Sequence, residues 1–312
     1  MRKFASRLFI LSLFILSLYG LGRLYYQVTG GFMVSNITSD FPFQPQWETR
    51  LLSMNEEEEV NKALDQPYYY LGKGCQSYVF ASEDGHYVIK FFKYQRYRLQ
   101  PWLAYFPSLP AIVKYRQEKM EKKWNKLDGF VKSWKIAFEN LKDETGLIFV
   151  HLNKTDHLQR HITLYDKMGQ KHEIYLDQME FCVQCRADML CDTLLQQKEN
   201  GNLAESKQLI HQLLNTILSE YARGLADNDH ALMQNTGVAN GKPIHIDVGQ
   251  FVFNEDVKQP KVFHQELFTK TYKFKIWLRE NYSDLADYLE QELRQVIGPD
   301  YAVMYPKWRK KD

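Results

Sequence analysis

The sequence predicts an α+β protein with two lobes, a small and mainly β amino-terminal lobe and a short helical carboxy-terminal lobe, behind an amino-terminal membrane helix. Three observations predict it. An apolar run follows three basic residues at the start of the chain, a pattern of strands joined by a glycine turn begins at residue 68, and a long amphipathic helix leads into a segment rich in Asp and Asn. We therefore divide the 312 residues into an anchor (1–24), a spacer (25–66), the amino-terminal lobe (67–181) and the carboxy-terminal lobe (182–312).

The composition excludes several classes of protein. Hydrophobic residues make up 45%, charged residues 25% and aromatic residues 14%, which is typical of a folded chain and not of a disordered or collagen-like one. Forty basic residues against 38 acidic ones leave a net charge of +2, so no nucleic-acid partner is expected. Four cysteines are too few for a disulfide-built scaffold of this length.

The first segment has the layout of a signal peptide or a signal anchor. Three basic residues precede the apolar run Leu8–Leu21, which leaves almost no polar face, so a buried amphipathic helix fits poorly. We expect membrane contact through residues 8–22 and retention as an anchor, because no clear cleavage site follows; cleavage would give a secreted form. Only Arg23 lies close behind the run, so the positive-inside rule places the bulk of the chain on the extracytoplasmic or lumenal side.

The segment between the anchor and the first lobe has the composition of a spacer. It contains Gly30-Gly31, two prolines and the acidic run Glu56–Glu59. We interpret the acidic run as a solvated turn of helix and assign it no binding role.

The first chemical motif is a pair of strands joined by a glycine-rich turn. Tyr68–Leu71 has the composition of a strand, and Gly72 and Gly74 follow it. Glycines at these positions permit a tight turn and let backbone N–H groups approach phosphate oxygens, where a side chain would block the way. After a hairpin, Lys90 is expected on a strand beneath this turn. An ordinary hairpin turn is the alternative interpretation of the two glycines taken alone.

With these residues in place, the sequence resembles the protein-kinase-like superfamily, whose glycine-rich loop reads G-x-G-x-x-G-x-V and whose third strand carries V-A-I-K. Ser77 stands where the family has its third glycine, and Val88-Ile89-Lys90 stands for the lysine strand. The resemblance implies a bound nucleotide, ATP, contacted by Gly72, Gly74, Ser77 and Lys90. Neither a Walker-type phosphate loop nor a glycine turn that opens a dinucleotide-binding helix fits the sequence.

A kinase-like lobe also needs a helix whose glutamate holds the lysine. Apolar side chains recur at helical spacing between residues 113 and 127, Glu121 flanks this stripe, and Glu118 points further towards solvent. The resemblance implies that Glu121 contacts Lys90, with Glu118 as the alternative. Further strands are predicted over Leu147–Leu152, Ile162–Tyr165 and His172–Leu176, and the hinge that meets the adenine is expected at Met179-Glu180-Phe181.

A long helix leads into the second chemical segment. Apolar residues recur at helical spacing between Leu209 and Tyr221 and predict a buried stripe. The chain then passes through Asp227-Asn228-Asp229 to Asn235, and through a strand pair to Asp247-Val248-Gly249. In order and spacing, this stretch is similar to the H-R-D, Asn and D-F-G elements of the kinase catalytic region.

The resemblance assigns roles to these residues. Asp229 would accept the proton of the attacking hydroxyl, and Asn235 and Asp247 would hold Mg²⁺ through oxygen atoms. Lys90 would steady the nucleotide phosphates. The gap from Asp229 to Asn235 is one residue longer than in the family, and Asp227 occupies the place of the usual histidine. Asp227 therefore remains a second candidate for the base.

The end of the chain bears on the type of kinase. Two helices are predicted around Val262–Arg279 and Leu285–Val296, and no A-P-E element follows Gly249. Because protein-substrate kinases seat a peptide in this region, the short lobe favours an atypical kinase, whose hydroxyl acceptor is a small molecule, a lipid-linked molecule or a protein. A lumenal site would need a compartment supplied with ATP. The alternatives are a pseudokinase acting as a nucleotide-binding or interaction module, and a membrane-tethered structural protein.

The cysteines raise one further hypothesis. Cys182 and Cys185 form a C-x-x-C pair, Cys191 follows, and His172 is near in sequence, so a zinc site is conceivable. A second C-x-x-C or a pair of histidines is missing. Thiols packed against the junction of the lobes are the interpretation that we favour.

Overall fold

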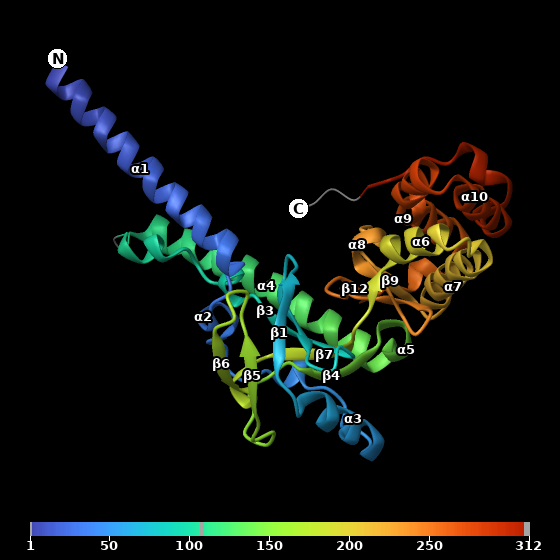
Figure 1. Ribbon diagram of the computed structural model, residues 1–312, viewed down its shortest axis with the longest axis horizontal. Helices are drawn as coiled ribbons and strands as arrows, with labels where there is room; N and C mark the ends of the chain where they lie inside the picture. The colour runs from blue at the N-terminus through green and yellow to red at the C-terminus, as the bar shows by residue number, and fades with distance from the viewer. Residues whose placement is uncertain (1, 107–108, 309–312) are drawn as a thin grey trace. The chain divides into compact units, whose positions relative to one another are not determined.

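The computed structural model describes residues 2–106 and 109–308. It consists of two compact units built from interleaved segments of the chain. Unit 1 comprises Met1–Pro45, Leu52–Lys123 and His151–Val183, and unit 2 comprises Gln46–Leu51, Trp124–Val150 and Gln184–Asp312. Strands dominate the first and helices the second, as the labels of Figure 1 show, so the predicted α+β class is confirmed.

The chain begins with one long helix, α1 (Arg2–Thr29), which projects from the rest of unit 1 in Figure 1. Over Phe9–Thr29 it has the length and the apolar composition needed to cross a membrane. The described side chains of this stretch are exposed up to Val28, and Thr29 is buried. Among the helices in the described part of the chain, α1 alone has this length and composition. It ends at Gly30 and Gly31, whose positive φ angles of 67° and 74° break the helical pattern.

The segment that was expected to be a spacer contains ordered elements. They are α2 (Val34–Ile37), η1 (Pro45–Trp47) and α3 (Met54–Leu64). Phe32 and Ile37 are buried in unit 1. A capping box between Ser53 and Glu56 starts α3, and the glutamates that follow in this helix include exposed ones, in agreement with the predicted solvated turn.

Unit 1 is built around neighbouring strands of a seven-stranded sheet, which lie in the order β7-β3-β2-β1-β5-β6. These strands are β1 (Tyr68–Lys73), β2 (Ser77–Ser82), β3 (Tyr87–Phe92), β5 (His161–Tyr165), β6 (Lys171–Tyr175) and β7 (Phe181–Cys185). The predicted strand–turn–strand–hairpin–strand pattern corresponds to β1, β2 and β3, which pair antiparallel. Short 3₁₀ turns complete the unit: η2 (Tyr94–Arg96), η3 (Pro101–Tyr105) and η4 (Leu176–Gln178).

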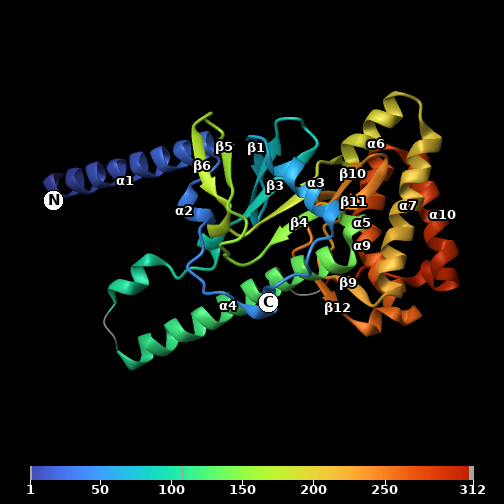
Figure 2. The same ribbon diagram turned by 90° about the horizontal axis from the view of Figure 1, so that it is seen from below.

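Unit 2 has a helical core. Its helices are α5 (Lys142–Thr145), α6 (Leu190–Glu199), α7 (Leu203–Ala222), α8 (Leu232–Asn235), α9 (Pro260–Asn281) and α10 (Ser283–Ile297), together with α4 (Pro110–Asn140) from Trp124 onwards. Figure 2 shows α7, α9 and α10 side by side, and their apolar faces form one buried cluster. The predicted long helix and both predicted carboxy-terminal helices are confirmed by α7, α9 and α10.

Short strands of unit 2 carry the predicted catalytic segment. They are β8 (Asp188–Met189), β9 (Leu225–Asp227), β10 (Thr236–Ala239), β11 (Lys242–His245) and β12 (Phe251–Phe253), with η5 (Glu255–Lys258) and η6 (Gly298–Val303) following. The strand β4 (Leu147–His151) belongs instead to the seven-stranded sheet, as the edge strand beside β7. β9 pairs antiparallel with β12, and β10 pairs antiparallel with β11. These two ladders position the loops described next.

Candidate functional site

The glycine turn of unit 1 and the predicted lysine lie on neighbouring strands. Gly72 pairs with Val79 of β2, and Val79 pairs with Lys90 of β3, so the three residues form one row across the sheet. Neighbouring strands lie about 4.8 Å apart, which puts Lys90 two strand spacings from Gly72. The N–H of Gly74 donates to the carbonyl of Ser77 at 3.0 Å and closes the turn. Unit 1 therefore brings together the predicted nucleotide-binding residues Gly72, Gly74, Ser77 and Lys90.

The two glycines are not required by the shape of the turn. Neither has a positive φ. A Cβ atom built on Gly72 would meet nothing within 4 Å, and one on Gly74 would meet only the Ser77 hydroxyl, at 3.9 Å. The expectation that glycine is needed here to turn the backbone is therefore wrong. The open space beside both positions is where a phosphate oxygen would approach the backbone.

Cations surround this turn. The Lys93 ammonium donates to the carbonyl of Gly74 at 2.5 Å, and the Arg96 guanidinium donates to the carbonyl of Cys75. Burial, together with the positive charges of Lys73 and Arg96, lowers the pKa of Lys93 to about 8. A phosphate group would counter these charges, so the donors around the turn fit a nucleotide.

The predicted glutamates lie on the exposed part of α4. Both Glu118 and Glu121 are exposed, and the helix buries its apolar face only from Leu127 onwards. Lys90 is 6% exposed within β3. A contact between Lys90 and Glu121 stays a prediction.

The predicted hinge lies partly inside secondary structure. Met179 donates its N–H to the carbonyl of Leu176 at 3.0 Å, and its own carbonyl accepts a hydrogen bond from His151 Nδ1 at 2.7 Å. Burial lowers the pKa of His151 to about 4, so the ring is neutral and Nδ1 carries the proton. Phe181 starts β7. The N–H of Met179 is therefore engaged within unit 1, and contact of the segment Met179-Glu180-Phe181 with an adenine stays a prediction.

In unit 2, two loops are fastened to each other at both ends. The loop 228–235 joins β9 to β10, and the loop 246–250 joins β11 to β12. The N–H of Asn228 donates to the carbonyl of Gln250 at 3.1 Å, and the N–H of Ile246 donates to the carbonyl of Asn235 at 2.8 Å. The two ladders and these bonds set the segment of Asp229 and Asn235 beside the segment of Asp247.

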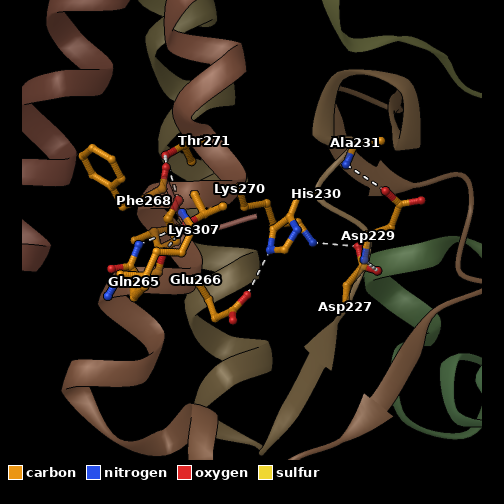
Figure 3. Close-up of polar contacts among 12 residues, drawn as sticks. Asp227, Asp229, His230, Ala231, Gln265, Glu266, Phe268, Lys270, Thr271 and Lys307 are labelled. Atoms are coloured by element: carbon orange, nitrogen blue, oxygen red, sulfur yellow. Dashed lines mark hydrogen bonds and ion pairs between the residues drawn. The ribbon is translucent and has the colours of Figure 1, made fainter. Parts of the chain in front are cut away.

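Asp227 is part of a buried ion pair. Its Oδ2 lies 2.6 Å from the ammonium of Lys270, which extends from α9, and both side chains are 3% exposed (Figure 3). Its Oδ1 accepts a hydrogen bond from the N–H of Asp229 at 2.9 Å. Both oxygens are thus engaged inside the fold.

Asp229 is more accessible and sits at the start of a turn. Its Oδ1 accepts a hydrogen bond from the N–H of Ala231 at 3.0 Å, as Figure 3 shows, and its Oδ2 accepts one from Gln250 Nε2 at 3.2 Å. The side chain is partly exposed. Next to it, His230 pairs with Glu266 of α9 at 3.0 Å.

The two predicted metal ligands have the oxygen donors that Mg²⁺ prefers. Asn235, 9% exposed, ends α8 and supplies an amide oxygen, and Asp247 supplies a carboxylate whose Oδ1 accepts the N–H of Gly249 at 3.2 Å. Val248 is fully buried, and its carbonyl accepts a hydrogen bond from Ser133 of α4. This donor set fits a magnesium ion.

The zinc hypothesis finds no cluster to support it. Within residues 2–106 and 109–308, no three or more His, Cys, Asp or Glu side chains form a group that could hold a metal ion. Cys182 is buried, Cys185 and Cys191 are partly exposed, and Cys75 is exposed. Cys182 and Cys185 are three positions apart on β7, so their side chains point to opposite faces of the strand and cannot share an ion.

Several structural partners of the site were not predicted. Lys270 pairs with Asp227, Glu220 of α7 pairs with His245 at 2.6 Å, and Ser133 also accepts the N–H of Phe251 at 2.6 Å. Lys270 and Glu220 are charged residues inside otherwise apolar helical stripes. That pattern is the signal that could have identified both, because a buried charge requires a partner.

No family model matches the sequence, and no curated protein matches it. Similar solved structures include WbdD, with 17% identity over 67% of this chain and 38% of that chain (TM-score 0.37), and WbdD with the kinase inhibitor LY294002, with 15% identity over 76% and 46% (TM-score 0.34). A streptomycin–ATP–APH(2″)-IIa ternary complex matches at 13% identity over 83% and 98% (TM-score 0.23). The chain thus spans less than half of the WbdD chain.

One of the WbdD structures is described as a bifunctional kinase-methyltransferase. In the present chain, the order of elements is a glycine hairpin and a lysine strand in unit 1, then a long helix and two fastened loops in unit 2. This is the order of elements that the resemblance in sequence predicted.

Proposed function

We propose that this protein is a membrane-anchored atypical kinase that transfers the γ-phosphate of ATP to a hydroxyl acceptor. The observation that carries the proposal is the fastening of loop 228–235 to loop 246–250, because it gathers a carboxylate base and two oxygen ligands on adjoining segments. The glycine turn with its cations and Lys90 supports nucleotide binding independently in unit 1. The carboxylates and the amide are the groups that phosphoryl transfer needs.

Each residue has a definite part in this proposal. Asp229 accepts the proton of the acceptor hydroxyl, because Asp227 is buried and paired with Lys270. Asn235 and Asp247 would hold Mg²⁺, which supplies neutralising charge at the phosphates. Lys90 would orient the nucleotide phosphates from β3. Asp227 and Lys270 hold the base segment in place, since Asp227 accepts the N–H of Asp229.

A pseudokinase is the second candidate. It is favoured by Ser77 in the place of the third glycine and by the two hydrogen bonds that Asp229 already accepts from Ala231 and Gln250. Such a protein would bind nucleotide without turnover. Turnover therefore separates the two candidates.

Nucleotide binding is tested on the full chain in lipid nanodiscs. We expect Mg-ATP at a hundredfold excess over its dissociation constant to stabilise the protein by about 2.7 kcal/mol in thermal unfolding. Asp247→Ala should remove most of this gain by removing a metal ligand. Absence of any gain in the parent protein would contradict nucleotide binding.

Turnover is then measured with labelled ATP. Asp229→Asn should lower the rate by about 10²–10⁴-fold, because it removes the base and leaves an amide oxygen to accept the N–H of Ala231. An unchanged rate in this variant would show that Asp229 is not the base. Nucleotide binding without turnover in the parent protein would identify the pseudokinase.

A further inference from the structure

The end of the membrane-helix candidate is fixed on the glycine turn. The Lys73 ammonium, between the two glycines, donates to the carbonyl of Gly30 at 2.6 Å and lies 3.5 Å from the centre of the Tyr26 ring. The Tyr78 hydroxyl donates to the carbonyl of Gly31. The last turn of α1 and the turn between β1 and β2 therefore form one packed junction.

A second turn lies at the same end of the sheet. β5 runs parallel to β1, and its last residue, Tyr165, pairs with Tyr69. The turn from β5 to β6 therefore lies at the same end of the sheet as Lys73, the last residue of β1. The Lys167 ammonium in this turn donates to the carbonyl of Gln27 in α1 at 2.8 Å. Figures 1 and 2 both show the end of α1 beside β5 and β6.

The β5–β6 turn holds an apolar side chain outward. Asp166 Oδ1 accepts the N–H groups of Met168 and Gln170 at 2.9 and 3.0 Å, and its Oδ2 pairs with His172 at 2.9 Å, which makes the turn rigid. Met168, at the tip of this turn, is 63% exposed. Lys167 beside it is exposed as well. A large apolar side chain flanked by a cation suits the boundary between lipid tails and headgroups.

The length of α1 sets the depth of this junction in a bilayer. The stretch Phe9–Thr29 has 21 residues. At a rise of 1.5 Å per residue it measures about 31 Å, close to the 30 Å of a hydrocarbon core. Gln27 and Gly30 then lie at the boundary of the core. In that placement, the lysines that contact their carbonyls would lie at the depth of the lipid phosphates, and Tyr25 and Tyr26 would lie at the level where aromatic side chains gather.

We infer that this end of unit 1 is a membrane-docking surface, formed by Lys73 of the glycine turn and by Lys167 and Met168 of the β5–β6 turn, and that its partner is an anionic phospholipid bilayer. The inference rests on the membrane anchoring in the proposed function. It deepens that function, because a glycine turn held at the lipid surface brings the phosphate donor to a lipid-linked hydroxyl acceptor rather than to a soluble one.

The docking surface is tested by lipid-borne quenching of a fluorophore in the full chain, reconstituted in nanodiscs. Cys75 is exposed, and Cys185 and Cys191 are partly exposed, so they are first replaced by Ser. A label on Met168→Cys is compared with one on His86→Cys, which lies in the β2–β3 turn beyond Ser82, at the end of the hairpin opposite Lys73. We expect strong quenching at 168 and none at 86. Equal quenching at the two sites would overturn the inference.

A third label separates this inference from the anchoring on which it rests. A label on Leu16→Cys reports insertion of α1 and requires no nucleotide. Quenching at 16 without quenching at 168 would overturn the docking surface and leave the anchored kinase standing. Absence of quenching at 16 would overturn the anchoring and the docking surface together.

The role of charge is tested in the same nanodiscs. A lysine at an anionic surface contributes roughly fivefold to membrane binding, so Lys167→Gln should lower the docked-to-undocked ratio of the label at 168 by that factor in anionic lipid. Lys62→Gln in α3 is the matched control, since α3 is bonded to the start of β1 through Tyr68 and the carbonyl of Ala63. An equal effect of the two variants would contradict the assignment of Lys167.

Discussion

Two buried lysines, one in each unit, have opposite surroundings. Lys270 of unit 2 faces the carboxylate of Asp227 at 2.6 Å, with both side chains 3% exposed. Lys93 of unit 1 is 7% exposed and faces a backbone carbonyl of the glycine turn, while Lys73 and Arg96 add like charges around it. One lysine is neutralised inside the fold, and the other is crowded by cations.

The difference shows how a buried lysine with a structural role differs from a buried lysine that could bind an anionic ligand. The charge of a paired lysine such as Lys270 is balanced by a carboxylate of the protein itself, so it needs no ligand. Lys93 has a pKa lowered to about 8, which means that the folded protein disfavours its charge. An incoming phosphate would reverse that effect. The glycine turn is therefore the region that a ligand should stabilise most.

Substitution of the two lysines should give the largest difference in stability. We expect Lys270→Met to lower the free energy of unfolding by about 3–5 kcal/mol, because Asp227 is left buried without its counter-charge. Lys93→Met removes one hydrogen bond to a carbonyl and the cation–π contact of the ammonium with the Tyr78 ring at 4.4 Å, but it relieves repulsion, so it should cost at most about 1–2 kcal/mol. Urea unfolding of the full chain in detergent micelles measures both. Equal losses would contradict the contrast between the two sites.

A double variant tests the cause of the larger loss. Asp227→Asn combined with Lys270→Met leaves no buried charge at this site, so part of the stability should return relative to Lys270→Met alone. If the double variant is less stable than either single one, the loss comes from packing and not from the unpaired carboxylate.

A buried carboxylate in unit 1 sharpens the comparison further. Glu180 is 2% exposed and accepts a hydrogen bond from Ser39 at 2.6 Å, whereas Asp227 has a lysine at the same distance. Burial raises the pKa of Glu180 to about 7 from its usual 4.5. The folded protein thus binds a proton that the unfolded chain releases between these two values.

Stability should therefore fall as the pH rises from 4.5 through 7, where Glu180 loses its proton in the folded state. The full loss is about 3 kcal/mol, since each pKa unit corresponds to 1.36 kcal/mol. Glu180→Gln keeps an oxygen for the Ser39 hydroxyl and carries no charge. It should be more stable than the parent by up to this amount at pH 8 and equal to it near pH 4.5, in urea unfolding series. An equal gain at both values would assign the effect to packing.

Much of the fold could be predicted because it follows from local patterns. Alternating and glycine-flanked stretches located β1, β2 and β3, and helical apolar stripes located α7, α9 and α10. The register that aligns Gly72 with Lys90 follows from the hairpin order. The spacer was harder to predict, because Phe32 and Ile37 belong to a short stretch that shows no sustained periodicity, yet both are buried.

The different surroundings of Asp227 and Asp229 could not be predicted. The two residues have the same chemistry and lie two positions apart, and Asp227 differs because it pairs with Lys270, which lies 43 residues away on α9. Sequence order also could not show that Gly72 and Gly74 have open space and ordinary backbone angles. Both facts depend on tertiary packing, and both change what the motif residues are expected to do.

The smallest expected change in stability belongs to the glycine turn and gives the sharpest test of its role. Gly74→Ala places a Cβ in ordinary contact with the Ser77 hydroxyl at 3.9 Å, so the stability should change by no more than about 0.5 kcal/mol. The same methyl group would occupy the space of a phosphate oxygen, so the affinity for Mg-ATP should fall by roughly tenfold, or about 1.4 kcal/mol. Thermal unfolding with and without nucleotide measures both quantities.

A matched glycine elsewhere completes this test. Gly241, in the turn between β10 and β11, also has nothing within 4 Å of a built Cβ, but its φ is +74°. Gly241→Ala should therefore cost about 1 kcal/mol of stability through backbone strain and leave the nucleotide affinity unchanged. Both variants add the same methyl group. If Gly74→Ala weakens nucleotide binding without loss of stability, and Gly241→Ala lowers stability without loss of binding, the phosphate lies at the glycine turn. If Gly74→Ala binds Mg-ATP as tightly as the parent protein, the glycine turn does not contact the nucleotide. A change in folding could not mask a lost contact, because this variant is expected to be as stable as the parent.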